Sequence, residues 1–433
     1  MISYLKSIFN FGHKSKINII LDFCFLFFLM CTMITIPIFS FKTKYTVITW
    51  IFTIAMFLVI GVEFLLFYDI KIDYVVISLS LFVFCGIFSS ILNGFKNVVF
   101  TPLLLNIVSI ILYLYLRSNK SLIKPSLFAI YLALSIFVLA FLILYGKDVL
   151  KLNFERLGNE FGDQNDVSLF LSLAFAMSLF FAFHAKPILF KILVLIIAGL
   201  AFVCGASTGS KVFILTVATS IITTIALFFG KKRWYLSLAT IAVIVIMGII
   251  MFSLPFMATT KKRLLLFISS FVDIGYNQSI GVDASSFDRF HLMKSSFQLF
   301  LNKPLFGYGI NGFQNANGFY NGWSHNNLGE FLCDFGIIGT ILFHSPIIVS
   351  LVFYFMNKDN RNNITKRLAV LLIIFFISAM LSVAFTREKI YSYIIPIPIL
   401  VLFEKEDVVS FSLKKYLLGL INKKKNKDSD LII

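Results

Sequence analysis

Long apolar runs, separated by short polar segments, make up most of the chain. A run of about 20 residues is long enough to cross a hydrocarbon core of about 30 Å as a helix. On this basis we predict an all-α polytopic membrane protein with about 12 transmembrane helices. The predicted spans are residues 17–41, 45–67, 72–92, 98–116, 126–145, 167–183, 187–203, 212–229, 235–256, 328–355, 368–385 and 391–403.

These spans divide the chain into four parts. Residues 1–256 hold the first nine transmembrane helices with short loops, and residues 257–326 form a large extracytoplasmic loop with amphipathic helices between the ninth and tenth spans. Residues 327–405 hold the last three spans, and residues 406–433 form a basic cytoplasmic tail.

The orientation follows from the basic residues between the spans. Lysines and arginines concentrate in alternate short connections, for example at Lys71, Arg117 and Lys186. The positive-inside rule therefore places both termini in the cytoplasm and the large loop outside. Two acidic residues, Asp22 and Glu63, lie within or near the ends of spans, and we expect them to reach the membrane interface.

Composition supports this class and excludes several functions. Of 433 residues, 59% are hydrophobic and 14% are charged, and the net charge is +17. Most of that charge lies in predicted cytoplasmic loops and in the tail, where anionic membrane lipids are a sufficient partner, so we expect no nucleic acid. Five cysteines show no metal-ligand spacing, and no glycine-rich nucleotide motif is present. We therefore expect no metal, no cofactor and no direct use of ATP.

Residues 285–339 concentrate the polar chemistry of the chain. Ser285 and Asp288 have the spacing of a capping box, and Pro304 prevents a helix from continuing, so we predict a helix over 285–302. A glycine-rich loop follows, and a second helix is predicted to begin near Asn327 and to run into the membrane.

Three polar residues lie on one stripe of this second helix. Asn327, Glu330 and Asp334 fall at positions i, i+3 and i+7, and His325 comes just before them. Unpaired carboxylates entering a membrane helix are costly, which indicates a functional or orienting role for Glu330 and Asp334.

Two further segments are predicted on the outer face. The first, 146–166, carries Arg156 and Asn165, and the second, a turn over 204–211, ends at Lys211. The predicted topology thus brings four segments that are distant in sequence to one side of the membrane. Together with the cations of the large loop, this arrangement indicates an anionic substrate.

The motifs resemble those of the O-antigen ligase and Wzy-type polymerase superfamily. The resemblance covers roughly residues 150–390 and does not separate ligases from polymerases. Lys211 stands where arginine is more usual, and lysine keeps the charge but lacks the bidentate fork. The similar segments are Lys303-Pro-Leu-Phe-Gly-Tyr-Gly-Ile-Asn-Gly-Phe, Ser324-His-Asn-Asn-Leu-Gly-Glu-Phe-Leu-Cys-Asp-Phe-Gly-Ile-Ile-Gly, Arg156-Leu-Gly-Asn-Glu-Phe-Gly-Asp-Gln-Asn165, Ala206-Ser-Thr-Gly-Ser-Lys211 and the upstream Arg289.

The resemblance implies an inverting, metal-independent glycosyl transfer from undecaprenyl diphosphate at the bacterial inner membrane. The expected partners are an undecaprenyl-diphosphate-linked glycan and membrane lipids, and a chain-length regulator is a candidate protein partner. An activated sugar-diphosphate bond needs no nucleotide. The enzyme has to stabilise a departing diphosphate and remove a proton from an acceptor hydroxyl.

Each task has candidate residues. Arg289 is the first candidate for the diphosphate, because a guanidinium binds two phosphate oxygens and stays charged; Arg156 and the weaker Lys211 are further candidates. His325 is the candidate base, because an imidazole can accept a proton near neutral pH, and Glu330 or Asp334 could orient it. The remaining candidate glycan contacts are Asn165 and Asn326.

Structural alternatives stay open for four of these residues. His325 could cap a helix, Arg289 could reach lipid phosphates, and Arg156 could pair with a neighbouring glutamate. Asn165 could cap the helix predicted to begin at Asp166.

Three functions are compatible with the sequence. The first is a polymerase that joins lipid-linked repeat units into O-antigen or capsular polysaccharide on the outer face of the inner membrane. The second is an O-antigen ligase that passes the glycan to a lipid A core or a protein. The third is a transporter or flippase of lipid-linked sugars, which predicts broken helices in matched halves of the chain.

Overall fold

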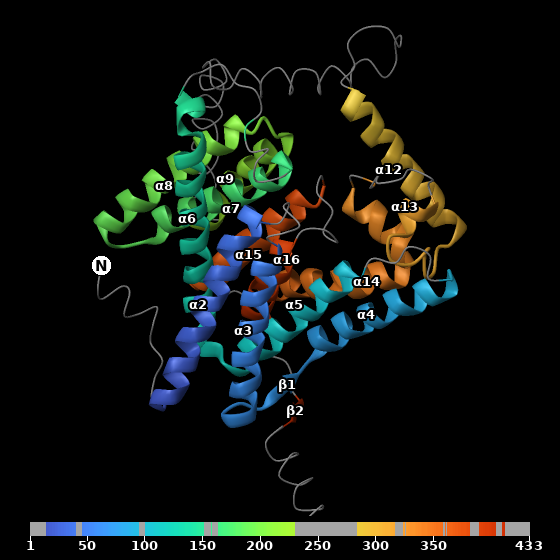
Figure 1. Ribbon diagram of the computed structural model, residues 1–433, viewed down its shortest axis with the longest axis horizontal. Helices are drawn as coiled ribbons and strands as arrows, with labels where there is room; N and C mark the ends of the chain where they lie inside the picture. Colours follow the sequence, from blue (N-terminus) through green and yellow to red (C-terminus); the bar gives the residue numbers. More distant parts are fainter. Residues whose placement is uncertain are drawn as a thin grey trace, which may run out of the picture.

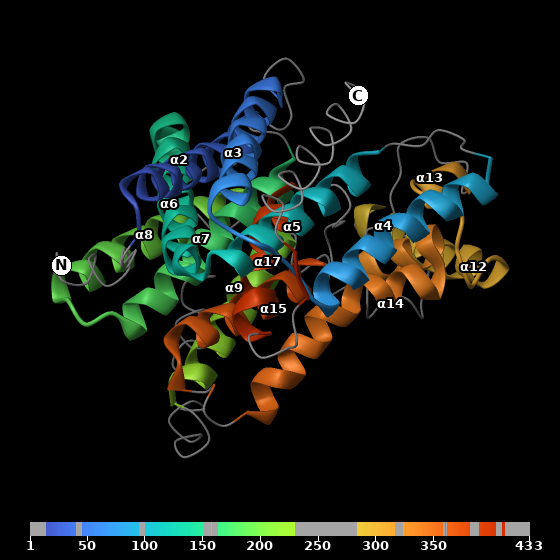
Figure 2. The same cartoon turned by 90° about the horizontal axis from the view of Figure 1, so that it is seen from below.

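The computed structural model describes residues 14–39, 46–94, 100–150, 157, 163–229, 284–316, 324, 326–357, 360, 362–381, 389–403 and 409–411. It is a helical assembly with one small two-stranded sheet (Figures 1 and 2). The elements are α2 (Lys16–Phe39), α3 (Thr46–Leu66), β1 (Ile70–Ile72), α4 (Tyr74–Leu92), α5 (Thr101–Ser118), the 3₁₀ turn η1 (Lys120–Leu122), α6 (Ile123–Leu150), α7 (Gln164–His184), α8 (Ile188–Ser207), α9 (Lys211–Phe229), α12 (Ala284–Asn302), α13 (Gly312–Ala316), α14 (Asn327–Met356), α15 (Ile364–Ala379), α16 (Lys389–Ile394), α17 (Pro396–Leu402) and β2 (Val409–Phe411).

The all-α polytopic class is confirmed. Within the described ranges, nine helices are long and apolar enough to cross a membrane, namely α2 to α9 and α14. The count of 12 stays a prediction, because the predicted span 235–256 lies outside the described residues. The last two predicted spans are shifted along the chain. Residues 368–385 correspond to the 16-residue α15, which begins at Ile364 and ends at Ala379. Residues 391–403 correspond to α16 and α17, since Pro396 begins a new helix.

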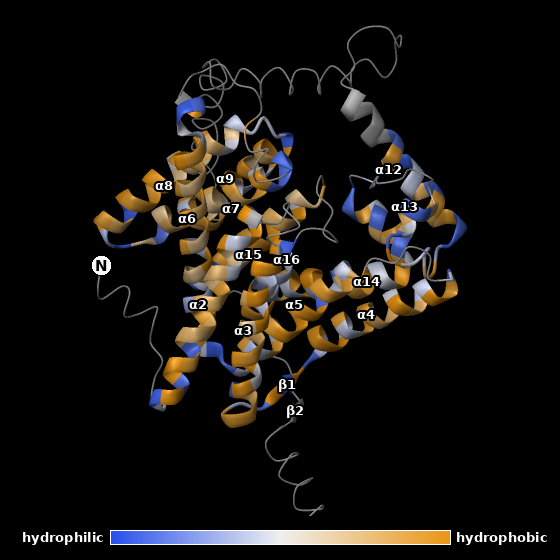
Figure 3. Ribbon diagram, in the orientation of Figure 1, coloured by the Kyte–Doolittle hydropathy of each residue, from blue (hydrophilic) through white to orange (hydrophobic). Residues whose placement is uncertain are grey.

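Apolar side chains form both the core and the outer surface of this assembly. In the core, Phe82 of α4 packs against Phe331, Phe335 and Phe343 of α14, with ring centroids 4.9–5.7 Å apart. On the outside, side chains such as Ile143 are 83% exposed. Figure 3 shows apolar residues along the outer sides of the helices and polar residues mostly near their ends. This distribution is the one expected of helices in contact with lipid.

Buried polar networks hold one end of the assembly together. Asp22 pairs with Lys14 at 2.7 Å and accepts a hydrogen bond from the Asn119 amide at 2.8 Å, while Glu63 accepts one from the Tyr115 hydroxyl. The expectation that Asp22 and Glu63 reach the interface is therefore wrong, since both are fully buried. Each carboxylate instead finds a partner on a neighbouring helix, as buried charges require.

The same end holds the small sheet. β1 pairs antiparallel with β2, so the segment after α17 contacts the connection between α3 and α4. Beside it, the buried guanidinium of Arg117 lies 3.3 Å from Asp73 and donates a hydrogen bond to the carbonyl of Phe403 at 3.1 Å. The start of α2 and the end of α17 thus lie at one end of the assembly, in agreement with their predicted placement on one side of the membrane.

Candidate functional site

The helix α14 is broken near its start. Gly336 has φ 64° and ψ −170°, a backbone conformation that is essentially restricted to glycine. The apolar pattern of the predicted span 328–355 gives no sign of this break. Backbone groups at such a break must find new partners, because lipid offers none.

The partners come from the loop that follows α12. The amides of Ile337 and Ile338 donate to the carbonyls of Pro304 and Leu305, at 2.8 and 3.3 Å. In the opposite direction, the amides of loop residues 308 and 309 donate to the carbonyls of residues 333 and 334, at 2.9 and 2.7 Å. The glycine-rich loop predicted after residue 304 is therefore confirmed, and it fills the break in α14.

Glycine permits this close approach. Gly307 has φ 67°, and a Cβ atom at this position would meet the carbonyl oxygens of Cys333 and Asp334 at 2.5 Å. No real Cβ atom fits there, so a side chain at position 307 would push the loop away from α14.

Asp334 fastens the same loop. Its carboxylate is 3% exposed and accepts a hydrogen bond from the Phe313 amide at 2.7 Å. This contact gives Asp334 an anchoring role that the helical stripe of Asn327, Glu330 and Asp334 does not reveal, because position 313 is distant in sequence.

The first turn of α14 is held by a compact set of hydrogen bonds. Asn326 caps the helix by accepting from the Gly329 amide at 2.8 Å, which confirms the predicted helix start. Glu330 is 4% exposed and accepts from both the amide and the hydroxyl of Ser324, at 3.1 and 3.0 Å. The Ser324 hydroxyl also contacts the carbonyl of Asn326 at 2.7 Å. Both neighbours of His325 are therefore fixed, while His325 itself lies outside the described residues.

Helix α12 covers this turn. The side-chain nitrogen Nδ2 of Asn326 lies 3.5 Å from the sulfur of Met293, and Ser296 packs directly against Gly329. Arg289 precedes Met293 by four residues, so its backbone lies one turn away on the same side of α12. The backbone of Arg289 is thus one helical turn from the residue of α12 that contacts Asn326, and the Arg289 side chain is not among the described ones.

A second group of predicted residues meets where α7 begins. The Asn165 side chain accepts a hydrogen bond from the Ser210 hydroxyl at 2.9 Å, and Lys211, half-buried, is the first residue of α9. The Leu157 amide donates to the carbonyl of Ser207 at 3.3 Å. Segments 146–166 and 204–211, which the sequence predicts only to lie on one side of the membrane, are in direct contact here. Arg156 lies outside the described residues.

The capping alternative for Asn165 is wrong. Asp163 caps α7 by accepting from the Asn165 amide at 2.7 Å, and α7 begins at Gln164 rather than at Asp166. Asn165 therefore lies within the first turn, and its side chain is directed to the turn before α9. Asn165 therefore does not cap its own helix, and its side chain connects α7 to the turn before α9.

Helix α15 connects the two groups. The Asn327 amide at the start of α14 donates to the carbonyl of Met380 at 3.2 Å, at the end of α15. Two residues earlier in α15, Ser378 accepts a hydrogen bond from Thr219 of α9 at 3.0 Å. Thr219 follows Lys211 by eight residues, about 12 Å along the helix axis. Figure 1 shows α15 close to both α9 and α14.

The contact between Asn165 and Ser210 allows a direct test of this junction. A double-mutant cycle with Asn165→Ala and Ser210→Ala is expected to give a coupling of about 1 kcal/mol, because each single change removes the same half-buried hydrogen bond. The measurement is thermal unfolding of the purified protein in detergent. Additive effects of the two substitutions would show that the contact does not tie α7 to α9.

Sequence reasoning assigns no role to Ser324, Ser210 or Met380. No spacing rule links a serine to a glutamate six residues later, or a helix start to the end of another helix 50 residues away. Only the packing of α12, α14 and α15 makes these residues part of the site. Within the described residues, no three His, Cys, Asp or Glu side chains gather in a way that could hold a metal ion.

Comparison with known proteins provides an independent assignment. Residues 197–344 match the family model described as O-antigen ligase. The matched part holds Lys211, Arg289, Asn326 and Glu330, whereas Asn165 precedes it. No curated protein matches the chain. This match over residues 197–344 supports the resemblance of this multi-pass membrane protein to the O-antigen ligase and Wzy-type polymerase superfamily.

Proposed function

We propose that the protein is a glycosyltransferase that joins undecaprenyl-diphosphate-linked repeat units into a polysaccharide on the outer face of the bacterial inner membrane. The observation that carries the proposal is the first turn of α14, where Ser324 and Asn326 are both fixed and α12 packs on top. A base between these two residues would be held in position before substrate arrives, which is what acid–base catalysis requires.

The proposed reaction is a displacement at the sugar carbon attached to diphosphate. The acceptor oxygen forms a bond to this carbon as the bond to the diphosphate oxygen breaks, and the electron pair leaves with the diphosphate. His325 takes the proton of the acceptor hydroxyl. Arg289 stabilises the charge that grows on the leaving diphosphate, since a fixed cation there favours the transition state.

The remaining candidates act around these two. Glu330 positions the peptide that carries His325 through its two hydrogen bonds to Ser324. Asn326 holds the start of α14 and lies next to the proposed base. Lys211 and Arg156 contribute further positive charge to a site for an anionic substrate. Asn165 holds the turn before Lys211 through its hydrogen bond with Ser210.

A ligase is the second candidate, because the matched family model is described as O-antigen ligase. Both reactions use the same donor and the same chemistry, and only the acceptor differs. A ligase passes the glycan to a lipid A core or a protein, whereas a polymerase passes it to another lipid-linked unit. In the polymerase, a chain-length regulator is the expected protein partner.

One reconstituted reaction separates the two candidates. Purified protein in lipid vesicles receives only an undecaprenyl-diphosphate-linked repeat unit, and the products are separated by size. We expect chains that lengthen without any lipid A core present. A reaction that starts only after a lipid A core is added would overturn the polymerase assignment in favour of the ligase. No transfer to either acceptor would contradict the glycosyltransferase proposal itself.

A further inference from the structure

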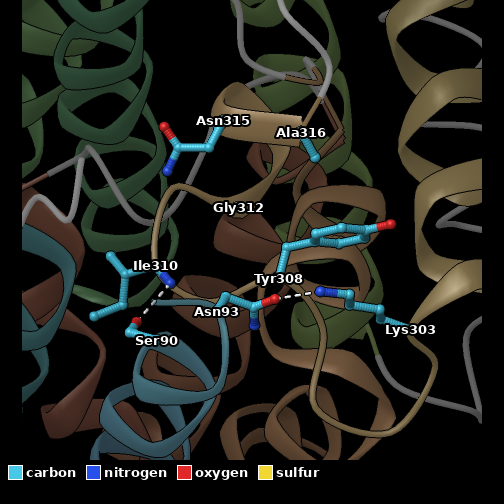
Figure 4. Close-up of a pocket in the computed structure, with 8 residues that line it drawn as sticks. All are labelled: Ser90, Asn93, Lys303, Tyr308, Ile310, Gly312, Asn315 and Ala316. Atoms are coloured by element: carbon cyan, nitrogen blue, oxygen red, sulfur yellow. Dashed lines mark hydrogen bonds between the residues drawn. The ribbon is translucent and has the colours of Figure 1, made fainter. Parts of the chain in front are cut away.

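A cavity lies beside the glycine-rich loop, on the side of the loop that faces α4. It has a volume of about 220 Å³ and opens to the surface. Figure 4 shows its lining, which includes Ser90, Asn93, Lys303, Tyr308, Gly312 and Asn315. Pockets for drug-sized ligands measure roughly 300–1,000 Å³, so this smaller cavity suits a single ring with its substituents.

Lys303 supplies the charge of this cavity. Its ammonium group donates a hydrogen bond to the side-chain oxygen of Asn93 and lies 4.5 Å from the centre of the Tyr308 ring. No carboxylate of a described residue lies within ion-pair distance of it. An ammonium group carries three N–H donors, so Lys303 has capacity for a further acceptor.

The lysine is held in place before any ligand binds. Asn93 is fixed by its amide group, which donates to the carbonyls of Ser89 and Gly307 at 2.8 and 3.2 Å. Its side-chain oxygen is thereby directed at Lys303. Lys303 is exposed to solvent, but its hydrogen bond to Asn93 restrains it. A restrained cation loses less freedom on binding than an unrestrained one, which favours affinity.

The other walls match the surface of a sugar. The Lys303 ammonium lies over one face of the Tyr308 ring, so the other face is the one that can pack against the carbon–hydrogen face of a pyranose ring. Asn315, at the exposed edge, can exchange hydrogen bonds with ring hydroxyls. The combination of a cation, amides and one aromatic face fits a sugar that also carries an anionic group.

Hydrogen bonds to Asp334 link the wall of the cavity to the proposed catalytic turn. The amides of Gly309 on the loop and of Phe313 in the following helix α13 donate to the carbonyl and the carboxylate of Asp334. Asp334 follows Glu330 by four residues, which is about 6 Å along α14. One extended glycan could therefore contact both places at once.

We propose that this cavity is a glycan subsite for a sugar that bears a carboxylate or a phosphate, with Lys303 binding the anionic group. The inference rests on the proposed function, because it places a sugar of the lipid-linked substrate or acceptor in the cavity. A subsite of this kind would favour repeat units that contain acidic sugars over repeat units that contain only neutral sugars.

Direct binding tests this subsite without turnover. Full-length protein in detergent is titrated with glucuronate, with glucose 6-phosphate and with glucose, and saturation-transfer NMR reports contact. We expect both anionic sugars to bind and glucose to bind at least about tenfold more weakly, since one charge-assisted hydrogen bond is lost. Equal binding of glucose would overturn the proposal.

Variants identify the residue responsible. Lys303→Gln is expected to weaken glucuronate binding by about tenfold or more, and Lys303→Arg is expected to keep most of it because the charge remains. Lys294→Gln is the matched control, since Lys294 is an exposed lysine on α12 outside the cavity. The proposal fails if Lys294→Gln lowers binding as much as Lys303→Gln does, or if the Lys303→Gln protein binds normally.

Two additional measurements distinguish this glycan subsite from a lipid headgroup site and from the proposed catalytic site. Short-chain phosphatidylglycerol that displaces glucuronate completely would identify a lipid headgroup site and overturn the glycan assignment. His325→Ala is expected to leave glucuronate binding unchanged. If the wild-type protein binds glucuronate but transfers no glycan in the reconstituted reaction, the proposed function is contradicted and the subsite is not. If the protein transfers glycan normally but binds glucose as well as it binds glucuronate, the subsite is contradicted and the proposed function is not.

Discussion

Replacing His325 with alanine is expected to reduce glycan transfer by about 10² to 10⁴-fold while the protein still inserts and folds. The expected loss has a simple cause: without the imidazole, no positioned group takes the proton of the acceptor hydroxyl. The surrounding hydrogen bonds do not depend on this side chain, because Glu330 holds Ser324 and Asn326 holds Gly329. The measurement is the glycan ladder on a gel from cells that carry the variant, together with the reconstituted reaction.

The matched control is His291→Ala. His291 is an exposed histidine on α12, two residues after Arg289, so the substitution removes an imidazole from the same region without touching the proposed base. We expect normal ladders from this variant. Long-chain glycan from a stably expressed His325→Ala protein would remove His325 as the base and with it the proposed mechanism.

A second large effect is expected at the break in α14. Gly336→Ala should lower the free energy of unfolding by about 3 kcal/mol or more, because alanine is strained at φ 64° and its Cβ would press on the carbonyl of Leu305. The loop can then no longer donate and accept the hydrogen bonds that fill the break. The apparent midpoint of thermal unfolding in detergent measures this loss, and transfer activity is expected to fall with it.

Gly199→Ala gives the comparison. Gly199 lies within α8, and a Cβ there would meet nothing within 4 Å. Alanine in a helix interior is more favourable than glycine by roughly 0.5–1 kcal/mol, so this variant is expected to be as stable as the parent or slightly more stable. Equal stability of Gly336→Ala and the parent would show that the break does not depend on the glycine.

Local signals predicted the helices around the site well. The capping spacing and Pro304 place one helix over 285–302, and α12 covers Ala284–Asn302. The start of α14 at Asn327 also agrees, because Asn326 is a typical capping residue. Such signals act between residues a few positions apart, so they can be read from the chain directly.

The same signals failed where the partner is distant. Asparagine is a common N-cap residue, but Asp163 caps α7 and the side chain of Asn165 contacts Ser210 instead. Asp22 and Glu63 have the positions of interfacial residues, but each is buried against a side chain of another helix. A hydrogen bond across helices leaves no periodic trace in the sequence, since its two residues are related only by packing.

By itself the sequence determined the class of the protein, the approximate limits of most helices and the segments that carry its chemistry. Apolar length and local capping suffice for these, because each depends on interactions within one stretch of chain. Only the tertiary structure decided that α14 is broken at Gly336, that Asp334 fastens the glycine-rich loop and that Lys303 faces a cavity beside Asn93. These features arise from contacts between segments up to about 200 residues apart, where backbone groups freed by the break must pair with whichever chain the fold brings to them.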